Sequence, residues 1–421
     1  MHFVELNKPK RKDFNGLYIK NGLFKKYWTR IKLTDNHKLK HFTFLLLVIL
    51  LYSIIKTIIK KNNIIFNKRK NIVHINQYKI EDLFNVTIKK KSIIIFEPNS
   101  FHYECTPGYS KFFIDLGYNV DIIMNKKGKD SFCLFDNQEN IRFFIYKKKK
   151  QITFLAKSLI KYINKYSLLI VQSVFPFNIN IINKLGLFRN NKVVYILHNT
   201  KYYQILSHHN ISDQNRIWTL GQFSIGLQVN PHYFGKIKIK DKNERTRFFI
   251  FSSSDRNYNY IISAAEKIKN ENFKFEICVA GYRNYFSEKD INETIKDNFI
   301  FNYRVNYPSL YKMIDSSDYI IINLDPDINK VYKDKKSTGA IQLSLGFKKP
   351  PLINNYFKDA YNMSKENSFL FEKTNFYDVM KNAILLNNID YKNMQNNLIQ
   401  LEQRVYDYSL LNIKKTLNHL F

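Results

Sequence analysis

A loop near residue 100 holds an imidazole, a carboxylate and a thiol within four residues. The stretch FEPNSFHYECTPGY, residues 96–109, contains His102, Glu104 and Cys105 between an apolar run and a Pro-Gly pair. A carboxylate or an imidazole beside a substrate hydroxyl can take its proton as a general base. A thiol nucleophile needs a base partner, and none is evident for Cys105, which we interpret as a packing residue. The loop therefore either closes a structural turn or forms an active-site wall, with Glu104 the favoured base and His102 the next.

A second stretch is suited to binding an anion. Ser337, Thr338 and Gly339 open an expected helix and follow Lys335 and Lys336. The first turn of a helix offers unpaired N–H groups and a partial positive charge, and small residues let a phosphate approach closely. The same residue types also make an ordinary helix N-cap. The sequence around this turn fits both interpretations.

Three more positions follow expected strands. His198 ends the strand of VVYILHNT, residues 193–200, where a histidine by itself is more often structural than functional. Arg256 in SSSDRNYNY, residues 252–260, could fork onto phosphate oxygens or form a surface ion pair. The Asp-x-Asp letters at 325–327 resemble a metal clamp, but we expect no metal site in this protein.

Strands and helices alternate along most of the chain, which is typical of parallel sheets covered by helices on both faces. The alternation pauses near 227–235 and then restarts, which predicts two similar halves with a cleft between them. Ligands in such folds bind beyond the carboxyl ends of the strands. The expected strands are 92–98, 119–124, 141–146, 167–173, 192–199, 247–254, 274–281, 299–305, 318–324 and 350–354, and the expected helices are 108–117, 153–166, 178–186, 259–270, 308–317, 337–347 and 392–417.

These patterns divide the 421 residues into four parts. Residues 1–90 form a basic amino-terminal region. Residues 91–235 and 236–391 form a first and a second Rossmann-like domain, with a hinge near 230–245. Residues 392–421 form a helix that we expect to pack back on the first domain.

The net charge of +32 favours anionic partners. Lysine runs at 89–91 and 147–150 fit solvated loops better than a dedicated binding patch. No zinc-finger spacing, aromatic ribonucleoprotein motif or heptad-linked basic region accompanies the charge, so we expect no specific nucleic-acid partner. Three cysteines without a CxxC pair indicate a chain that needs no disulfides.

An apolar stretch, FTFLLLVILLYSIIKTII at 42–59, follows a basic lead. Its charge-free part ends at Lys56, and a spanning helix needs about 20 apolar residues. The stretch is long enough only if Lys56 reaches the lipid headgroups. It is either a buried helix of a soluble domain or a membrane anchor, and we favour an anchor that spans the membrane once or lies at its surface. Lys and Arg are equally frequent on both sides, so the positive-inside comparison gives no orientation.

The segment YKDKKSTGAIQLSLGFKKPPLIN, residues 332–354, resembles GT-B glycosyltransferases of the broad group-1 (GT4-like) kind. In that family a helix of small residues meets the diphosphate of a nucleotide-sugar, and a Gly-to-Pro run, here Gly346 to Pro350, precedes the next strand. The family commonly has two glutamates separated by seven residues around this turn. This chain has Asp334 and Gln342 there, so the sugar-hydroxyl contact and retention of configuration do not follow from the resemblance.

The resemblance spans about residues 92–390 and implies roles for the candidates. His198 would hydrogen-bond the donor sugar, because the family often ends a cleft-facing strand with a hydrophobic-His-Asn/Asp run. Arg256 would neutralise the leaving diphosphate. The loop with His102 and Glu104 would shape the acceptor pocket. The other donor-binding residues would be Ser337, Thr338, Gly339, Gln342 and Asp334.

The resemblance also implies a fold and an activity. The fold would be α/β, with two Rossmann-like GT-B domains facing a cleft and the membrane-associated segment added at the amino terminus. The activity would be a metal-independent, hexosyltransferase-like transfer from a nucleotide-sugar, a co-substrate, with no cofactor. A glycan, lipid-linked or protein hydroxyl would be the acceptor, in surface glycan or glycolipid synthesis, and an anionic membrane surface would be a further partner.

Two other functions stay open. One is a nucleotide-sugar 2-epimerase of the same fold, against which the apolar segment at 42–59 argues because such enzymes are normally soluble. The other is a non-catalytic GT-B protein that binds glycan or anionic lipid, which the missing glutamate pair leaves open.

Overall fold

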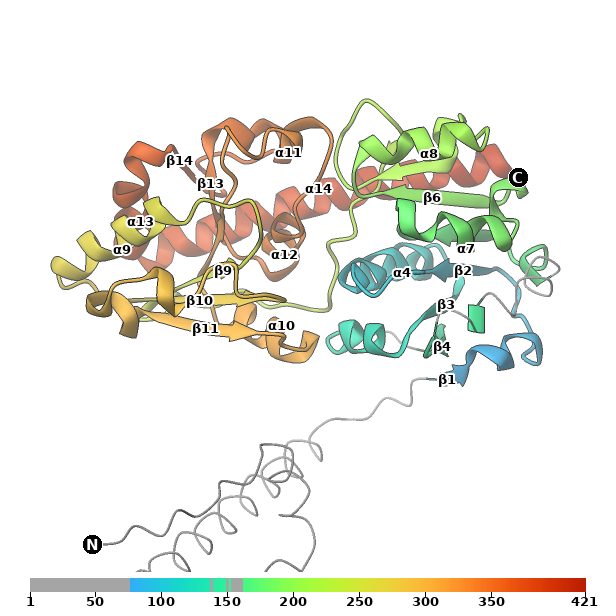
Figure 1. The fold of residues 1–421 in the computed structure, drawn as a ribbon, viewed down its shortest axis with the longest axis horizontal. Coiled ribbons are helices and arrows are strands. Elements are labelled where there is room, and N and C mark those ends of the chain that lie inside the picture. Colours follow the sequence, from blue (N-terminus) through green and yellow to red (C-terminus); the bar gives the residue numbers. More distant parts are fainter. Residues whose placement is uncertain (1–75, 137–138, 149–150, 153–161) are drawn as a thin grey trace, which may run out of the picture. The chain divides into compact units, whose positions relative to one another are not determined.

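The computed structural model describes residues 76–136, 139–148, 151–152 and 162–421, which belong to one compact unit, His74–Phe421. They form two parallel β-sheets with helices around them (Figure 1). The expected architecture of two α/β halves is thereby confirmed. The apolar segment at 42–59 and most of the expected helix at 153–166 lie outside the described residues. Across the described ranges, no helix combines the length and apolar character that a membrane crossing requires.

The first half is built on an eight-stranded sheet with the order β1-β4-β3-β2-β5-β6-β7-β8. Its central strands β2, β5 and β6 are near-continuous apolar runs because both faces are covered. In β2, Ile93 and Ile95 enter one core and Ile94 and Phe96 the other. The elements are β1 (Asn76–Lys79), β2 (Ser92–Phe96), α4 (Thr106–Asp115), β3 (Asn119–Asn125), β4 (Ile141–Tyr146), β5 (Leu168–Val171), α7 (Ile179–Lys184), β6 (Val193–Leu197), α8 (Tyr203–His208), β7 (Ile217–Thr219) and β8 (Leu227–Gln228).

The second half is built on a six-stranded sheet with the order β11-β10-β9-β12-β13-β14. Numbered from its first strand this is the 3-2-1-4-5-6 order of a doubly wound nucleotide-binding fold. The elements are β9 (Thr246–Phe251), α9 (Asn259–Asn270), β10 (Phe275–Gly281), β11 (Phe299–Tyr303), α10 (Tyr307–Asp315), β12 (Tyr319–Ile322), α11 (Val331–Asp334), α12 (Gly339–Phe347), β13 (Pro351–Asn354), β14 (Phe369–Phe371), α13 (Phe376–Leu385) and α14 (Asn388–Leu420).

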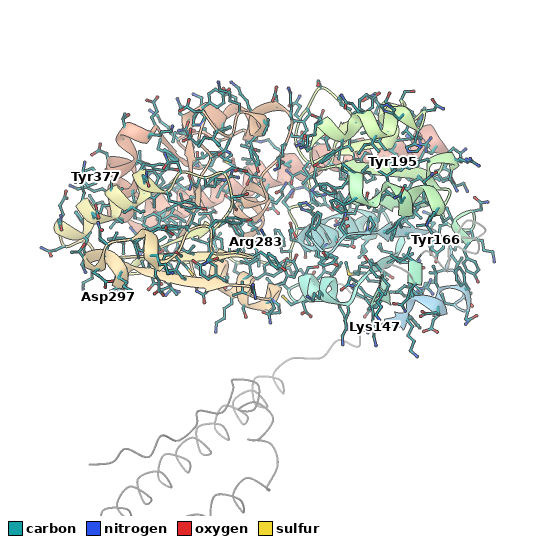
Figure 2. The ribbon with its side chains drawn as sticks, in the orientation of Figure 1. Lys147, Tyr166, Tyr195, Arg283, Asp297 and Tyr377 are labelled. Atoms are coloured by element: carbon teal, nitrogen blue, oxygen red, sulfur yellow. The ribbon has the colours of Figure 1, made fainter. Side chains whose placement is uncertain are left out.

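Each sheet has a point where the strand order reverses, and ligands of such folds bind there. In the first sheet this point lies between β2 and β5, and in the second between β9 and β12. Figure 2 shows Arg283, which follows β10, on the side toward the first half, and Asp297, which precedes β11, on the far side. The carboxyl ends of the second sheet therefore face the first half.

The linker between the halves, residues 229–245, packs against two glycines. A Cβ added at Gly108 of α4 would lie 2.5 Å from the carbonyl carbon of Pro231. A Cβ added at Gly346 of α12 would lie 2.3 Å from the carbonyl oxygen of His232. One helix from each half thus requires glycine where it meets the linker.

Helix α14 belongs to both cores. Leu398 and Leu401 pack into the core of the second half, whereas Ile413 and Leu417 pack into that of the first. The indole Nε1–H of Trp218 donates to the hydroxyl of Thr416 at 2.9 Å. Figure 1 shows α14 running from one half to the other and ending near β6.

Candidate active site

A cavity of about 370 Å³ lies where the carboxyl ends of the two sheets meet. The first half contributes two residues to the lining of this cavity. The second half contributes residues that follow β9, residues of α10 and β12, and residues at the start of α12. Six of the nine site residues expected from the sequence line this cavity. They are His102, Glu104, Arg256, Ser337, Thr338 and Gly339.

The first-half wall is a carboxylate held from two sides. Glu104 Oε1 lies 3.4 Å from His102 Nδ1, and the hydroxyl of Tyr307, in the second half, donates to Oε2 at 3.0 Å. Burial raises the pKa of the Glu104 carboxyl. The hydrogen bond and the charge interaction with His102, together with the hydrogen bond from Tyr307, outweigh burial and lower this pKa below its usual value. The carboxylate is therefore ionised at neutral pH and able to accept a proton.

His198 lies behind His102 and is not part of the cavity lining. The two rings stack with centroids 4.0 Å apart and an interplanar angle of 23°. Only 6% of His198 is exposed. Burial, and then the proximity of His102, lower the pKa of His198 well below its ordinary value. The His198 imidazole is therefore neutral at physiological pH.

A buried acid is linked to this histidine pair through a hydroxyl from a neighbouring strand end. Glu97, directly after β2, accepts the N–H of Asn99 at 2.7 Å and contacts Ser173 Oγ at 2.6 Å. Ser173 Oγ also lies 3.3 Å from His198 Nε2. Burial raises the pKa of Glu97 to about 8. Neither Glu97 nor Ser173 was among the site residues expected from the sequence.

The start of α12 faces the cavity with small residues. The Thr338 hydroxyl accepts the N–H of Ala340 at 3.4 Å, so Thr338 is the N-cap of the helix. A Cβ added at Gly339 would meet no atom within 4 Å. The N-cap and anion-site interpretations therefore coexist, because the cap uses one hydroxyl and leaves open space at the first turn.

The two positions with the glutamate spacing place no carboxylate at the cavity. Gln342 is buried, its Nε2 donates to Ser337 Oγ at 3.3 Å, and its Oε1 has no partner within the described residues. Asp334 ends α11, is exposed, and does not line the cavity.

Two cations flank one tyrosine on the second-half wall. The guanidinium of Arg256 lies 5.0 Å and the ammonium of Lys336 lies 4.7 Å from the ring centroid of Tyr332. Burial raises the pKa of Tyr332, but the charges of Arg256 and Lys336 outweigh it and lower the pKa below the usual value. The wall therefore has a positive potential that suits an anion. Sequence reasoning noted the charge of Lys336 but missed Tyr332.

Two buried polar groups at the cavity lack a partner within the described part of the chain. They are the Nδ2 amide of Asn323 and the hydroxyl of Tyr311. Asn323 comes directly after β12, and its Oδ1 accepts the hydroxyl of Tyr260 at 2.7 Å. Buried polar groups are normally hydrogen-bonded, so these two unpaired groups are exceptions beside the cavity. The position of Asn323 at a strand end was a signal that sequence reasoning did not use.

The Asp-x-Asp letters at 325–327 form an ion-pair site. The ammonium of Lys373 lies 2.8 Å from both Asp325 and Asp327. Among the residues that the structure describes, no group of three or more His, Cys, Asp or Glu side chains is arranged to hold a metal ion.

The walls also meet through the backbone. The N–H of Thr200 donates to the carbonyl of Lys335 at 2.8 Å, and Asn199 forms a β-bridge with Lys336. The strand end that carries His198 is thus joined to the turn that carries the proposed diphosphate site.

No protein-family model matches the sequence, and no curated protein matches it either. Among solved structures, a glycosyltransferase from Rickettsia africae ESF-5 aligns with 13% identity and a TM-score of 0.50, covering 79% of this chain and 99% of that one. Arabidopsis thaliana UGT89C1 complexed with quercetin aligns with 10% identity and a TM-score of 0.46, covering 79% and 100%. The E. coli ADP-heptose heptosyltransferase II aligns with 8% identity and a TM-score of 0.44, covering 70% and 98%.

At these identities the likeness to solved structures concerns the fold alone. This likeness does not test the expectation that the protein is of the group-1 kind. This chain has two parallel sheets, a cavity where their carboxyl ends meet, and a last helix shared by both cores. The chain thus has the GT-B fold of glycosyltransferases.

Proposed function

We propose that this protein is a glycosyltransferase that moves a sugar from a nucleotide-sugar donor to a hydroxyl acceptor. One observation carries the proposal. A single cavity sets a cationic wall and a helix start from one half opposite an ionised carboxylate from the other. Such a transfer needs a site for the leaving diphosphate and a group that accepts the proton of the attacking hydroxyl.

The donor diphosphate would bind at the second-half wall. Arg256 and Lys336 supply positive charge, and the first turn of α12 supplies N–H groups and open space at Gly339. These groups would stabilise the charge that builds up on the leaving diphosphate. We propose that they fill the role that a metal ion has in other transferases.

The acceptor hydroxyl would bind against Glu104 and His102. Glu104 is the proposed base because it is ionised and lies at the cavity. Its bond from Tyr307 joins the acceptor wall to the donor half. Closure of the two halves would therefore place the base and the donor site together.

The proposal also covers the subfamily, the pathway and the membrane attachment of the enzyme. The enzyme would be of the group-1 kind and would act in surface glycan or glycolipid synthesis. Residues 42–59 would hold it at a membrane, with the basic surface adding attraction to anionic lipid. Fractionation of the full-length protein tests the tether, because an apolar anchor is released by detergent and purely electrostatic binding by salt.

The experiment that tests the activity is a transfer assay on the full-length protein in detergent, with a panel of nucleotide-sugars, with and without acceptors, and with and without EDTA. Glu104→Gln keeps the shape and the bond from Tyr307 but removes the base. We expect turnover to fall about 10²- to 10⁴-fold and donor affinity to stay unchanged. Asp334→Asn, outside the cavity, is the matched control.

Conversion of the donor to its 2-epimer without transfer would establish the epimerase function instead. Donor or glycan binding with no turnover under any condition would establish a binding protein. Loss of activity in EDTA, restored by a divalent cation, would overturn the metal-independent mechanism.

A further inference from the structure

Three side chains form a buried hydrogen-bonded group on the first-half wall. Glu97, Ser173 and His198 are all below 10% exposed and come from the ends of β2, β5 and β6. Their contacts are Glu97 Oε2 to Ser173 Oγ at 2.6 Å and Ser173 Oγ to His198 Nε2 at 3.3 Å. His198 in turn stacks on His102, which lines the cavity. The group therefore connects a fully buried acid to the cavity wall.

The order of these groups differs from that of a nucleophilic triad. In such a triad the acid bonds the far ring nitrogen of the histidine, which then activates the serine. Here the acid bonds the serine itself, and Ser173 is fully buried. The hydroxyl of Ser173 consequently acts as a bridge between Glu97 and His198.

The bridge has one hydrogen to give, because a serine hydroxyl is a single donor. When Glu97 is ionised it only accepts, so the Ser173 hydrogen points to Glu97. His198 Nε2 then carries a hydrogen, which it donates to the carbonyl of Gln172 at 3.1 Å.

When Glu97 is protonated the direction reverses. The N–H of Asn99 occupies Oε1, so the acid hydrogen lies on Oε2 and points to Ser173. The Ser173 hydrogen then points to His198 Nε2, which accepts it as a bare nitrogen and gives up its own bond to the carbonyl of Gln172. The hydrogen of His198 moves to Nδ1.

We propose that Glu97 is a positioning residue that sets, through the Ser173 hydroxyl, which ring nitrogen of His198 carries the hydrogen, and thereby tunes the transferase site. The proposal rests on the proposed function only for its effect on rate. Burial, which raises the pKa of Glu97 to about 8, places the change of state near physiological pH.

Other titratable side chains lie close to this hydrogen-bonded group. Glu104 and His102 lie toward the cavity, and Lys336 acts on His198 from the second half. Tyr103 and Tyr146 lie near Glu97, and burial raises the pKa of both phenols well above the usual value. Both tyrosines therefore stay neutral below pH 10. Glu97 is the side chain of the hydrogen-bonded group that changes charge between pH 7 and 9.

The test is ¹⁵N NMR of the full-length protein labelled at histidine ring nitrogens, read from pH 5.5 to 9.5. Protonated and bare ring nitrogens have well-separated shifts, and His198→Asn identifies the His198 signals. The wild type should change from the Nδ1–H to the Nε2–H form as the pH rises through about 8. Glu97→Gln, whose amide permanently donates to Ser173, should stay in the Nδ1–H form. Ser173→Ala should stay in the Nε2–H form.

The dependence of the transfer rate on pH tests whether the hydrogen-bonded group affects turnover. At pH 6 Glu97→Gln should match the wild type, and at pH 9 the two should differ on the order of tenfold. Ser173→Thr keeps the hydroxyl and should restore the wild-type pH profile.

The outcomes separate the two proposals. An unchanged His198 form across the pH range, or a Ser173→Ala variant that titrates like the wild type, would overturn the inference. The NMR reading needs no substrate, so it stands or falls even if no transfer is found. A wild-type tautomer change with identical pH–rate profiles for wild type and Glu97→Gln would reject the tuning of rate.

Discussion

At the scale of single residues, the cavity separates charge between its walls. The second-half wall carries Arg256 and Lys336 around Tyr332, and the first-half wall carries the ionised Glu104. A nucleotide-sugar presents a doubly anionic diphosphate beside a neutral sugar. The positive wall therefore suits the diphosphate and the negative group suits the acceptor hydroxyl.

The first prediction concerns Arg256. A charge-assisted hydrogen bond to phosphate is worth roughly 1.5–3 kcal/mol, so Arg256→Ala should weaken donor affinity by about 10- to 100-fold. Lys336→Ala should act in the same direction. Lys335→Ala is the matched control because Lys335 does not line the cavity. Calorimetric titration with the donor measures all three, and equal affinity of Arg256→Ala and wild type would reject the diphosphate site.

The second prediction concerns stability and Glu97. Burial raises its pKa from the usual 4.5 to about 8 in the folded protein, so between these pH values the folded state holds a proton that the unfolded state has lost. Folding stability from this group therefore falls as the pH rises through that window. Glu97→Gln removes the effect.

The free energy of unfolding of the wild type, relative to Glu97→Gln, should fall by about 2–5 kcal/mol between pH 5 and pH 9. Urea titrations at several pH values measure it. A difference that does not vary with pH would show that Glu97 is not held protonated.

At the scale of elements, α12 has two glycines with opposite roles. Gly339, at its first turn, has open space around it, whereas Gly346, at its last turn, touches the linker at His232 and Phe234. The Gly-to-Pro run that supported the family resemblance thus serves packing at one end, and the small residues serve the cavity at the other.

The third prediction follows from this difference. Gly346→Ala forces a Cβ against backbone and should cost roughly 1–3 kcal/mol of stability, as overpacking does. Gly339→Ala should leave stability unchanged or slightly higher, because alanine favours helices more than glycine. It should nevertheless weaken donor binding, since its Cβ enters the cavity. Thermal unfolding and donor titration measure the two effects, and a reversed ranking of the two variants would contradict the assigned roles.

At the scale of the whole molecule, α14 joins the two halves. It contributes to the core of the second half through Leu398 and to that of the first through Ile413. Its Thr416 hydroxyl accepts from Trp218 at 2.9 Å and donates to the carbonyl of Asn215 at 2.8 Å. The helix therefore ties the first half to an element that starts in the second.

The fourth prediction concerns that tie. Thr416→Val keeps the shape but leaves the buried Trp218 Nε1–H without a partner, which should cost about 1–3 kcal/mol. Thr416→Ser keeps the hydroxyl and should cost about 1 kcal/mol, the value of one buried methyl group. Chemical denaturation compares them. Equal losses for the two variants would mean that the hydrogen bond contributes nothing.

Most of the longer strands and several helices of the described residues could be predicted from the sequence. The apolar runs at 141–146 and the amphipathic pattern at 259–270 predicted β4 and α9 with the bounds that the structure has. These elements are readable because a strand buried on both faces is mostly apolar and the apolar residues of a surface helix repeat every 3.6 residues. Short edge elements such as β1, β8 and β14 were missed, because two to four residues carry too little pattern.

Which strand ends are neighbours depends on the order of the strands in the two sheets. Glu97 and Ser173 are 76 positions apart and meet because β2 and β5 are adjacent where the strand order reverses. His198 and His102 meet because β6 lies next to β5, and Tyr307 reaches Glu104 from the other half. Hydrophobic periodicity specifies which face of a strand is buried, but strand order and the meeting of two halves depend on contacts between distant segments. The sequence could therefore name residues at strand ends, while the pairing of acid, hydroxyl and imidazole had to come from the fold.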